Sequence, residues 1–439
     1  MPPSKLQLLR TLLLQELRVL SDSPTLWGML IILSFLVGYS FIQAVNLFSQ
    51  ASQTALTYPA LAGGMNPQEG IFVPTFGAYY LVETLLLPFV IIRLIGQDKQ
   101  TGALKLLLQL PLSPFSLNLL KLAAMTCAWG LILLPGISTF FIWQYLGGAL
   151  YLPEILSLLT GHTLYTLTII CIAMFATAIS DSLPTAAIIC LAATLGSWVL
   201  NFAAGSGGWL GLLGNWSFTS QLRQFENGLL STNSIVYFLG LALLFFISAS
   251  ILIHPGRTLT HKLKSLTGTL AILLIVMTAA LQVPKYLDLT ENHKHSFNPA
   301  DVRALQKMQK PLKITIHLTR EDGRLYDFEH EILAKLRRVV PHLEVVFIQT
   351  QSAGLFGAAA DDNYGLIEYD YAGKHKQSYS NSPEEILPLL HSLAGHIVKS
   401  DKLPVYTGHP LATNANAFQW WFYLVLPLIF LFAARQARK

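Results

Sequence analysis

The feature that most constrains this chain is a series of apolar runs, each close to 20 residues long, that recur along its 439 residues. A helix of about 20 residues crosses a hydrocarbon core roughly 30 Å thick and satisfies its own backbone polar groups. Hydrophobic residues make up 53% of the chain and charged residues 12%, which is outside the usual range of soluble proteins. The sequence therefore predicts a polytopic α-helical membrane protein.

Eight transmembrane helices are predicted from the apolar windows. Their approximate ranges are 26–46, 76–95, 117–142, 156–179, 184–204, 234–253, 266–282 and 418–434. Four groups of basic residues flank these spans: Lys5, Arg10 and Arg18; Arg93, Lys99 and Lys105; Arg257, Lys262 and Lys264; and Arg435, Arg438 and Lys439. With eight spans all four groups fall on one side, so the positive-inside rule places both termini in the cytoplasm. This predicts a multi-pass protein of a cell membrane, favouring a bacterial inner membrane.

The N-terminal segment, residues 1–23, is predicted to be an amphipathic helix lying in the membrane interface. Leu6, Leu9, Leu13, Leu17 and Leu20 share one side of this helix, and polar residues lie on the other. The alternative is a frayed start to the first span, but Pro24 is suited to the first turn of a separate helix. Charged residues interleave with the apolar ones, which excludes a cleavable signal peptide.

The chain is divided into five predicted parts. They are the interfacial helix (1–23), a six-helix membrane domain (24–255), a cytoplasmic linker with the seventh span (256–282), an extracytoplasmic α/β domain (283–417), and the eighth span with a basic tail (418–439). A short interfacial or re-entrant helix is also predicted within 205–232, where Trp209 and Trp216 suit an aromatic belt. The three cysteines all lie in apolar spans, so no disulfide framework is expected in the α/β domain.

Alternating apolar residues indicate strands within the polar region. Residues 312–318 and 343–348 are predicted strands, and 327–340 has helical spacing between them, which together suggest a βαβ unit. Residues 364–371 and 376–379 are predicted to form a hairpin around Ala372 and Gly373, followed by a helix from Ser382.

The loop after the second span carries the most informative motif. It reads Gly-Gln-Asp-Lys-Gln-Thr-Gly-Ala-Leu-Lys-Leu-Leu-Leu-Gln-Leu-Pro-Leu-Ser over residues 96–113. A short amphipathic segment bounded by Gly102 and Pro111 can lie across the membrane face and move as a rigid body. The other interpretation of this segment is an ordinary solvated loop.

This motif resembles the ABC type-2 permease family over roughly residues 1–255. The matching positions are Asp98, Gly102, Ala103, Leu104, Leu110, Pro111 and Ser113, whereas Lys105 stands where the family has an acidic residue. The resemblance implies a coupling helix near 98–112 that contacts an ATPase, in which Asp98, Gly102, Ala103, Leu104, Leu106, Leu107 and Pro111 take part. It also implies a second permease protomer, identical or related. The chain has no glycine-rich phosphate loop with lysine, so ATP hydrolysis is expected in a separate subunit.

The polar region with the last two spans, about residues 266–434, resembles the auxiliary membrane component of gliding-motility type ABC systems. The resemblance rests on the 313–318 strand, the helix ending at Arg337 and Arg338, the 343–348 strand and the 364–369 strand. It implies that a permease half is fused to a shortened auxiliary subunit.

Few residues suggest other chemistry. Glu83 in the second span is a candidate functional carboxylate. It could equally lie near the outer interface, and it is too far along the helix from Arg93 for a direct pair. His293 and His295 could contribute to a metal site, but two ligands alone are not one, and exposed histidines are favoured. No catalytic constellation is apparent, and no cofactor, metal or nucleic acid is predicted.

The function predicted from sequence is a permease subunit that couples hydrolysis by a separate ATPase to export or to mechanical work on an extracytoplasmic protein or cargo. The lipid bilayer is its immediate environment. The alternatives are a non-transporting scaffold whose outer domain binds protein and, less favoured, a membrane-bound enzyme.

Overall fold

The computed structural model describes residues 5–203, 208–254, 256–282, 285–319, 322–348, 363–395 and 406–438. The chain divides into two compact units. The first, called here the membrane unit, comprises Met1–Leu289 with Thr407–Lys439, and the second, the α/β unit, comprises Thr290–Tyr406.

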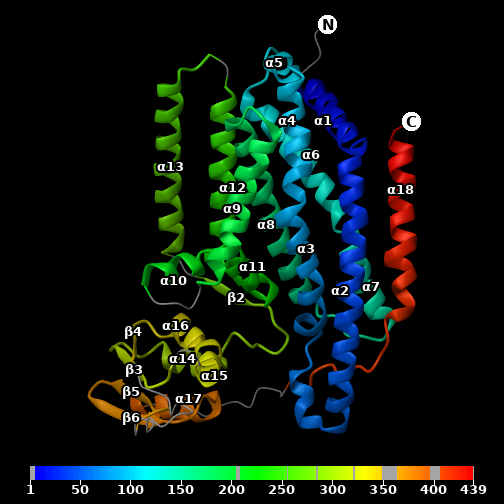
Figure 1. Cartoon of the computed structure of the whole chain (residues 1–439). Helices are drawn as coiled ribbons and strands as arrows, with labels where there is room; N and C mark the ends of the chain where they lie inside the picture. The colour runs from blue at the N-terminus through cyan, green and yellow to red at the C-terminus, as the bar shows by residue number, and fades with distance from the viewer. Residues whose placement is uncertain are drawn as a thin grey trace, which may run out of the picture. The chain divides into compact units, whose positions relative to one another are not determined.

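The membrane unit is almost entirely helical (Figure 1). Its helices are α1 (Lys5–Ser21), α2 (Pro24–Thr57), η1 (Pro59–Gly64), η2 (Gln68–Phe72), α3 (Val73–Leu85), α4 (Leu87–Gln100), α5 (Ala103–Leu107), α6 (Pro114–Ile132), α7 (Leu134–Tyr145), α8 (Leu152–Ile179), α9 (Leu183–Asn201), α10 (Gly208–Asn215), α11 (Phe218–Glu226), α12 (Thr232–Ile253), α13 (Leu259–Leu281), η4 (Asn416–Phe418), η5 (Trp421–Val425) and α18 (Leu426–Ala437).

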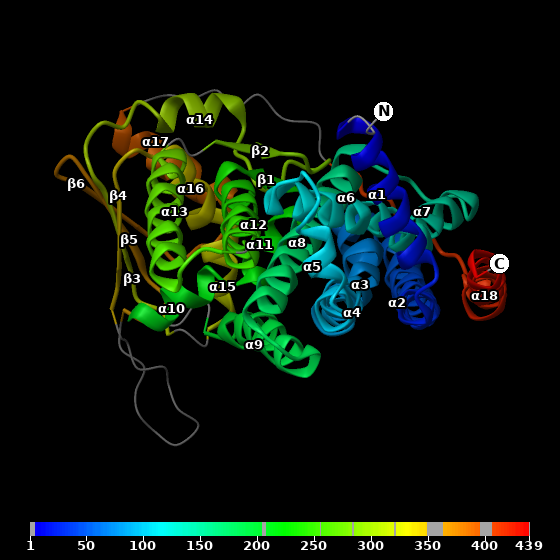
Figure 2. The ribbon, with the colours of Figure 1, turned by 90° about the horizontal axis from the view of Figure 1, so that it is seen from above.

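Within the described residues, eight helical segments are long and apolar enough to cross a membrane, so the eight predicted spans are confirmed as apolar helices. This indicates a multi-pass membrane protein. Figure 1 shows α1, α5 and the C-terminal end of α18 at one end of the unit, with α10 and α11 toward the other. Figure 2 looks down on the end that carries α1 and α5.

Residues 47–75, which the predicted spans 26–46 and 76–95 leave as a connecting loop, are helical for most of their length, so this loop was wrongly predicted. The first span is a helix of 34 residues, Pro24–Thr57, and the second runs for 33 residues, Gln68–Gln100. At 1.5 Å per residue each is roughly 50 Å long, which exceeds a hydrocarbon core of about 30 Å. An apolar window detects only the part of a helix that suits the core, so these polar extensions are missed.

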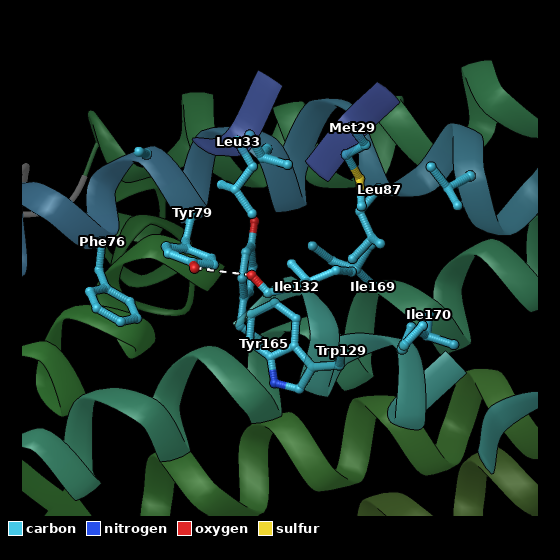
Figure 3. Close-up of a cluster of buried hydrophobic side chains, with 14 of the residues drawn as sticks. Met29, Leu33, Phe76, Tyr79, Leu87, Trp129, Ile132, Tyr165, Ile169 and Ile170 are labelled. Atoms are coloured by element: carbon cyan, nitrogen blue, oxygen red, sulfur yellow. Dashed lines mark hydrogen bonds between the residues drawn. The ribbon is translucent and has the colours of Figure 1, made fainter. Parts of the chain in front are cut away.

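Two spans are interrupted near prolines, between α3 and α4 and between α6 and α7. At the second break the buried Tyr79 hydroxyl donates to the Ile132 carbonyl (3.0 Å) and accepts from the Gly136 N–H (2.6 Å). These two backbone groups are the pair that an unbroken helix would join. Figure 3 shows Tyr79 reaching Ile132 among buried apolar side chains, so a side chain from α3 stabilises the break in the third span.

The last span packs against the first. The Ser34 hydroxyl donates to the Phe422 carbonyl at 2.6 Å, and the Phe41 and Phe422 rings are 6.0 Å apart. A Cβ added at Gly38 would lie 2.3 Å from Phe422 Cβ, so the absence of a side chain at Gly38 allows this close approach.

The N-terminal segment forms a separate helix, α1, as predicted. Leu13 and Leu17 pack against the core of the unit and Leu20 is buried, while Arg10 is exposed. Leu6, predicted on the same apolar side, is 77% exposed.

The segment predicted to hold a short helix contains two, α10 and α11. Ser217 caps α11 by accepting from the Ser220 N–H, and the Phe218 N–H donates to Ser197 of α9. After α11, strand β1 (Leu229–Ser231) pairs antiparallel with β2 (Tyr286–Asp288), which follows α13. This pairing was not predicted, because three-residue strands leave almost no periodic signal.

The α/β unit contains a four-stranded sheet of order β4-β3-β5-β6. Its strands are β3 (Leu312–Ile316), β4 (Leu343–Phe347), β5 (Ile367–Tyr371) and β6 (Lys374–Ser378); its helices are α14 (Pro299–Leu305), α15 (Gly323–Phe328), η3 (Glu329–Leu333), α16 (Ala334–Val339) and α17 (Pro383–Ala394). β3 and β4 are parallel and joined through a helix, which confirms the predicted βαβ unit. The predicted hairpin is β5–β6, whose turn residues Ala372 and Gly373 both have positive φ.

Candidate functional site

A buried ion cluster lies at the end of the membrane unit that carries α1 and α5. The Lys121 ammonium of α6 is 2.7 Å from Glu16 Oε1 of α1 and 2.5 Å from Asp98 Oδ2 of α4. The Lys121 side chain is only 5% exposed. Two carboxylates thus share one buried ammonium, which joins three helices at one point.

A second contact fixes the same end of α4. Lys99 donates to the Ser180 carbonyl (2.5 Å), just after α8, and lies 3.2 Å from the fully exposed Asp181 carboxylate. The neighbouring residues Asp98 and Lys99 therefore attach the end of α4 in two directions, to α6 and α1 on one side and to the α8–α9 turn on the other.

The loop after α4 contains a shorter helix than predicted. Gly102 has φ +79° and precedes α5, which has five residues, and turns then lead to Ser113, the N-cap of α6. Of the predicted coupling helix at 98–112, the first residues belong to α4 and those after Leu107 form turns. The left-handed conformation at Gly102 ends α4 and redirects the chain.

This loop has an inner and an outer face. Leu104 and Leu107 line a small cavity together with Leu12, Glu16, Lys121 and Ile253. Lys105, Leu106 and Gln109 are exposed, as is Pro111, and Leu106 is 68% exposed. The loop thus rests on the buried cluster with one face and presents the other to solvent; Lys105, Leu106 and Gln109 are called the outer face below.

Of the two candidates within the second span, only Glu83 is buried. Arg93 is exposed, and Glu83 is 1% exposed. Counting 15 residues of helix rise from Asp98 places Glu83 about 22 Å farther along the span, toward the end opposite α5. Arg93 and Glu83, both among the described residues, do not form an ion pair, which agrees with the predicted separation.

Glu83 belongs to a second buried cluster. His162 of α8 has Nδ1 3.2 Å from Glu83 Oε2, and its Nε2 lies 3.4 Å from Glu226 Oε1 of α11. The imidazole is completely buried and Glu226 is 8% exposed. The Gln68 side-chain amide donates to the Glu226 carbonyl, so the segment before α3 also contacts this cluster.

Sequence reasoning identified Asp98 and Glu83 but missed their partners. Glu16 and Lys121 lie 82 and 23 positions from Asp98, His162 and Glu226 lie 79 and 143 positions from Glu83, and no local spacing connects them. A usable signal existed for Lys121 and His162, because ionisable residues inside apolar spans are costly and are usually paired.

In the α/β unit, several ionisable side chains form hydrogen-bonded pairs. His391 Nε2 is 2.7 Å from Asp301 Oδ1, and both are buried. Asp322 accepts from Arg324 at 2.8 Å and from the Tyr364 hydroxyl at 2.6 Å, and the Arg324 hydrogen bond holds the pKa of the Asp322 carboxyl well below its usual range. Among the described residues no group of three metal-ligating side chains is found.

Comparison of the chain with protein-family models, curated proteins and solved structures gave no match. The motif at 96–113 and the two clusters are therefore the features of this chain that bear on its function.

Proposed function

We propose that this chain is the permease subunit of an ABC transporter, and that a separate ATPase subunit binds the outer face of the 102–111 loop. The observation that carries the proposal is the position of this loop on the buried Glu16–Lys121–Asp98 cluster. The resemblance of residues 96–113 to the ABC type-2 coupling segment supports the same conclusion. The termini and this loop are then cytoplasmic, as the distribution of basic residues favours.

The geometry suits transmission of force. A loop that moved independently of the helices would not transmit the motion of a bound partner to them. Here the end of α4, where the loop begins, is attached to α1 and α6 through Asp98 and to the α8–α9 turn through Lys99. Packed helices move against one another as rigid bodies over small distances. A displacement of α5 would therefore shift α1 and the ends of the third and fourth spans together.

The outer face has the character of a small protein interface. Leu106 supplies exposed apolar surface, and Lys105 supplies a positive charge beside it. With lysine here, the complementary surface on the ATPase would carry a carboxylate. A second permease protomer, an inner-membrane location, and an extracytoplasmic α/β unit that contacts protein or cargo complete the proposal.

Two adjacent leucines provide the experiment. L106E places a charge on the outer face, and L107E places one in the cavity over the ion cluster. L106E should abolish stimulation of the ATPase while the purified chain keeps its melting temperature, whereas L107E should lower the melting temperature. Full ATPase stimulation by a well-folded L106E protein would contradict the proposal.

A further inference from the structure

We propose that Glu83, His162 and Glu226 form a proton-binding site, and that the bound proton holds α11 against α8. The inference does not depend on an ATPase partner. It starts from the fact that both ring nitrogens of His162 face carboxylate oxygens, at 3.2 Å and 3.4 Å.

The hydrogen-bonding capacity of imidazole decides how many protons this arrangement needs. A neutral imidazole has one N–H and one lone pair, so with two ionised carboxylates the lone pair faces a carboxylate oxygen and repels it. Attraction at both nitrogens requires one more proton, either on the imidazole, so that it donates at both nitrogens, or on a carboxyl group, which then donates to the lone pair. Nε2 has no well-formed hydrogen bond among the described residues, so the Glu226 side is the weaker contact.

The charge of the cluster leads to the same conclusion. Without the extra proton, two negative charges are buried beside a neutral ring, and with it the net charge falls to one. Other titratable groups that face the cluster are the hydroxyls of Tyr79, Tyr80 and Tyr165; the Tyr80 hydroxyl is 2.6 Å from Thr219 and that of Tyr165 is 2.7 Å from Thr84. None of these hydroxyls carries a positive charge, so the added proton is the ligand that lowers the net negative charge of the site.

The proton would exchange through Glu226. Its side chain is 11% exposed, compared with 1% for Glu83 and 0% for His162. A proton taken from water onto the Glu226 carboxylate can pass to Nε2, and on release it returns to water by the same route. No other reactant is required.

The contact between α8 and α11 is close enough to depend on this charge. A Cβ at Gly161, next to His162, would lie 2.4 Å from Phe225 Cβ, next to Glu226. The Ser157 hydroxyl also donates to the Phe225 carbonyl at 2.9 Å. Repulsion between Nε2 and Glu226 would act directly on this interface, so loss of the proton should loosen α11.

Two proteins with one introduced cysteine each test the proposal, both in a C127S background because Cys127 is exposed, whereas Cys171 and Cys190 are buried. L222C reports on the buried face of α11, since Leu222 is 1% exposed, and R223C reports on its exposed face. The ratio of their rates with a maleimide cancels the pH dependence of the thiol itself. Between about pH 5 and about pH 10, a range that brackets the unperturbed imidazole, this ratio should rise at least tenfold as pH increases.

The variant E226Q supplies the decisive comparison. A glutamine amide donates to Nε2 without an added proton, so the ratio should stay low at every pH. In E83Q the glutamine amide would donate to Nδ1 instead, so the ratio should again stay low at every pH. This second variant keeps the test available if E226Q fails to fold. A pH-independent ratio in the parent protein, or an unchanged rise in both well-folded variants, would overturn the proposal.

Discussion

Lys121 Nζ lies 2.5 Å from Asp98 Oδ2, which joins the third span to the last turn of α4, from which the chain continues into the α5 loop. The same ammonium contacts Glu16, so a single side chain connects the N-terminal helix, the second span and the third.

Replacing Lys121 should therefore destabilise the membrane unit. K121M leaves the carboxylates of Glu16 and Asp98, 17% and 27% exposed, without a cation. The loss should be smaller than the cost of about 3–5 kcal/mol for removing one partner of a fully buried pair. The melting temperature of the purified protein in detergent measures the loss. D181N, which removes the fully exposed partner of Lys99, should leave the melting temperature nearly unchanged, because solvent screens such a pair. A partial recovery in K121M/E16Q/D98N would identify the unpaired charges as the cause, and equal effects of K121M and D181N would contradict this account.

The contact between the first and last spans gives a second prediction. G38A should displace α18 from α2, because the new methyl group would overlap Phe422, whereas G28A on the same helix has nothing within 4 Å. A disulfide between cysteines introduced at Ser34 and Phe422 should form in the G28A protein and form much more slowly in the G38A protein. Equal rates would show that α18 accommodates the methyl group.

The membrane topology gives a third. Cysteines at Gly323 and at Lys264, both exposed, should be labelled from opposite sides by an impermeant thiol reagent in intact cells. The positive-inside rule predicts labelling at 323 alone. Labelling at both positions, or only at 264, would remove the proposed orientation.

The α/β unit should unfold cooperatively as an isolated fragment of residues 290–406. It has its own buried core, which includes Leu312, Ile314, Phe328, Leu336 and Tyr369. A chain of about 120 residues is large enough to fold alone. A broad, non-cooperative thermal transition would contradict this expectation.

The fragment also allows a pH prediction. Asp322 has a lowered pKa when folded, so its contribution is fully present above the unfolded pKa, near 3.9, decreases as pH falls below that value, and is lost as pH falls through the folded pKa. Because Arg324 is half exposed, the contribution should be about 1 kcal/mol or less. D322N should lower the melting temperature at pH 7 and lower it by a smaller amount near pH 2. An equal effect at both pH values would exclude the ionic contribution.

The sequence was most informative where structure follows from neighbours along the chain. Apolar windows located the spans, and alternation located β3, β4 and the β5–β6 hairpin with its turn at Ala372 and Gly373. The clusters around Lys121 and His162 could not be predicted, because each joins residues whose meeting depends on how distant helices pack. The ends of the long helices were missed for a related reason, since polar helical turns outside the membrane have no apolar signature.

The measurement that tests the central claim most directly is site-specific photo-crosslinking from the outer face of the α5 loop. A photoreactive residue at Leu106, introduced into the full chain in its native membrane, should capture a polypeptide that carries a glycine-rich phosphate loop and binds ATP. The same photoreactive residue placed at Leu61, an exposed position in η1 and not in the α5 loop, should not capture this polypeptide. Capture of such an ATPase only from position 106 is the predicted result, and efficient crosslinking at 106 to other proteins or to lipid alone would contradict the account.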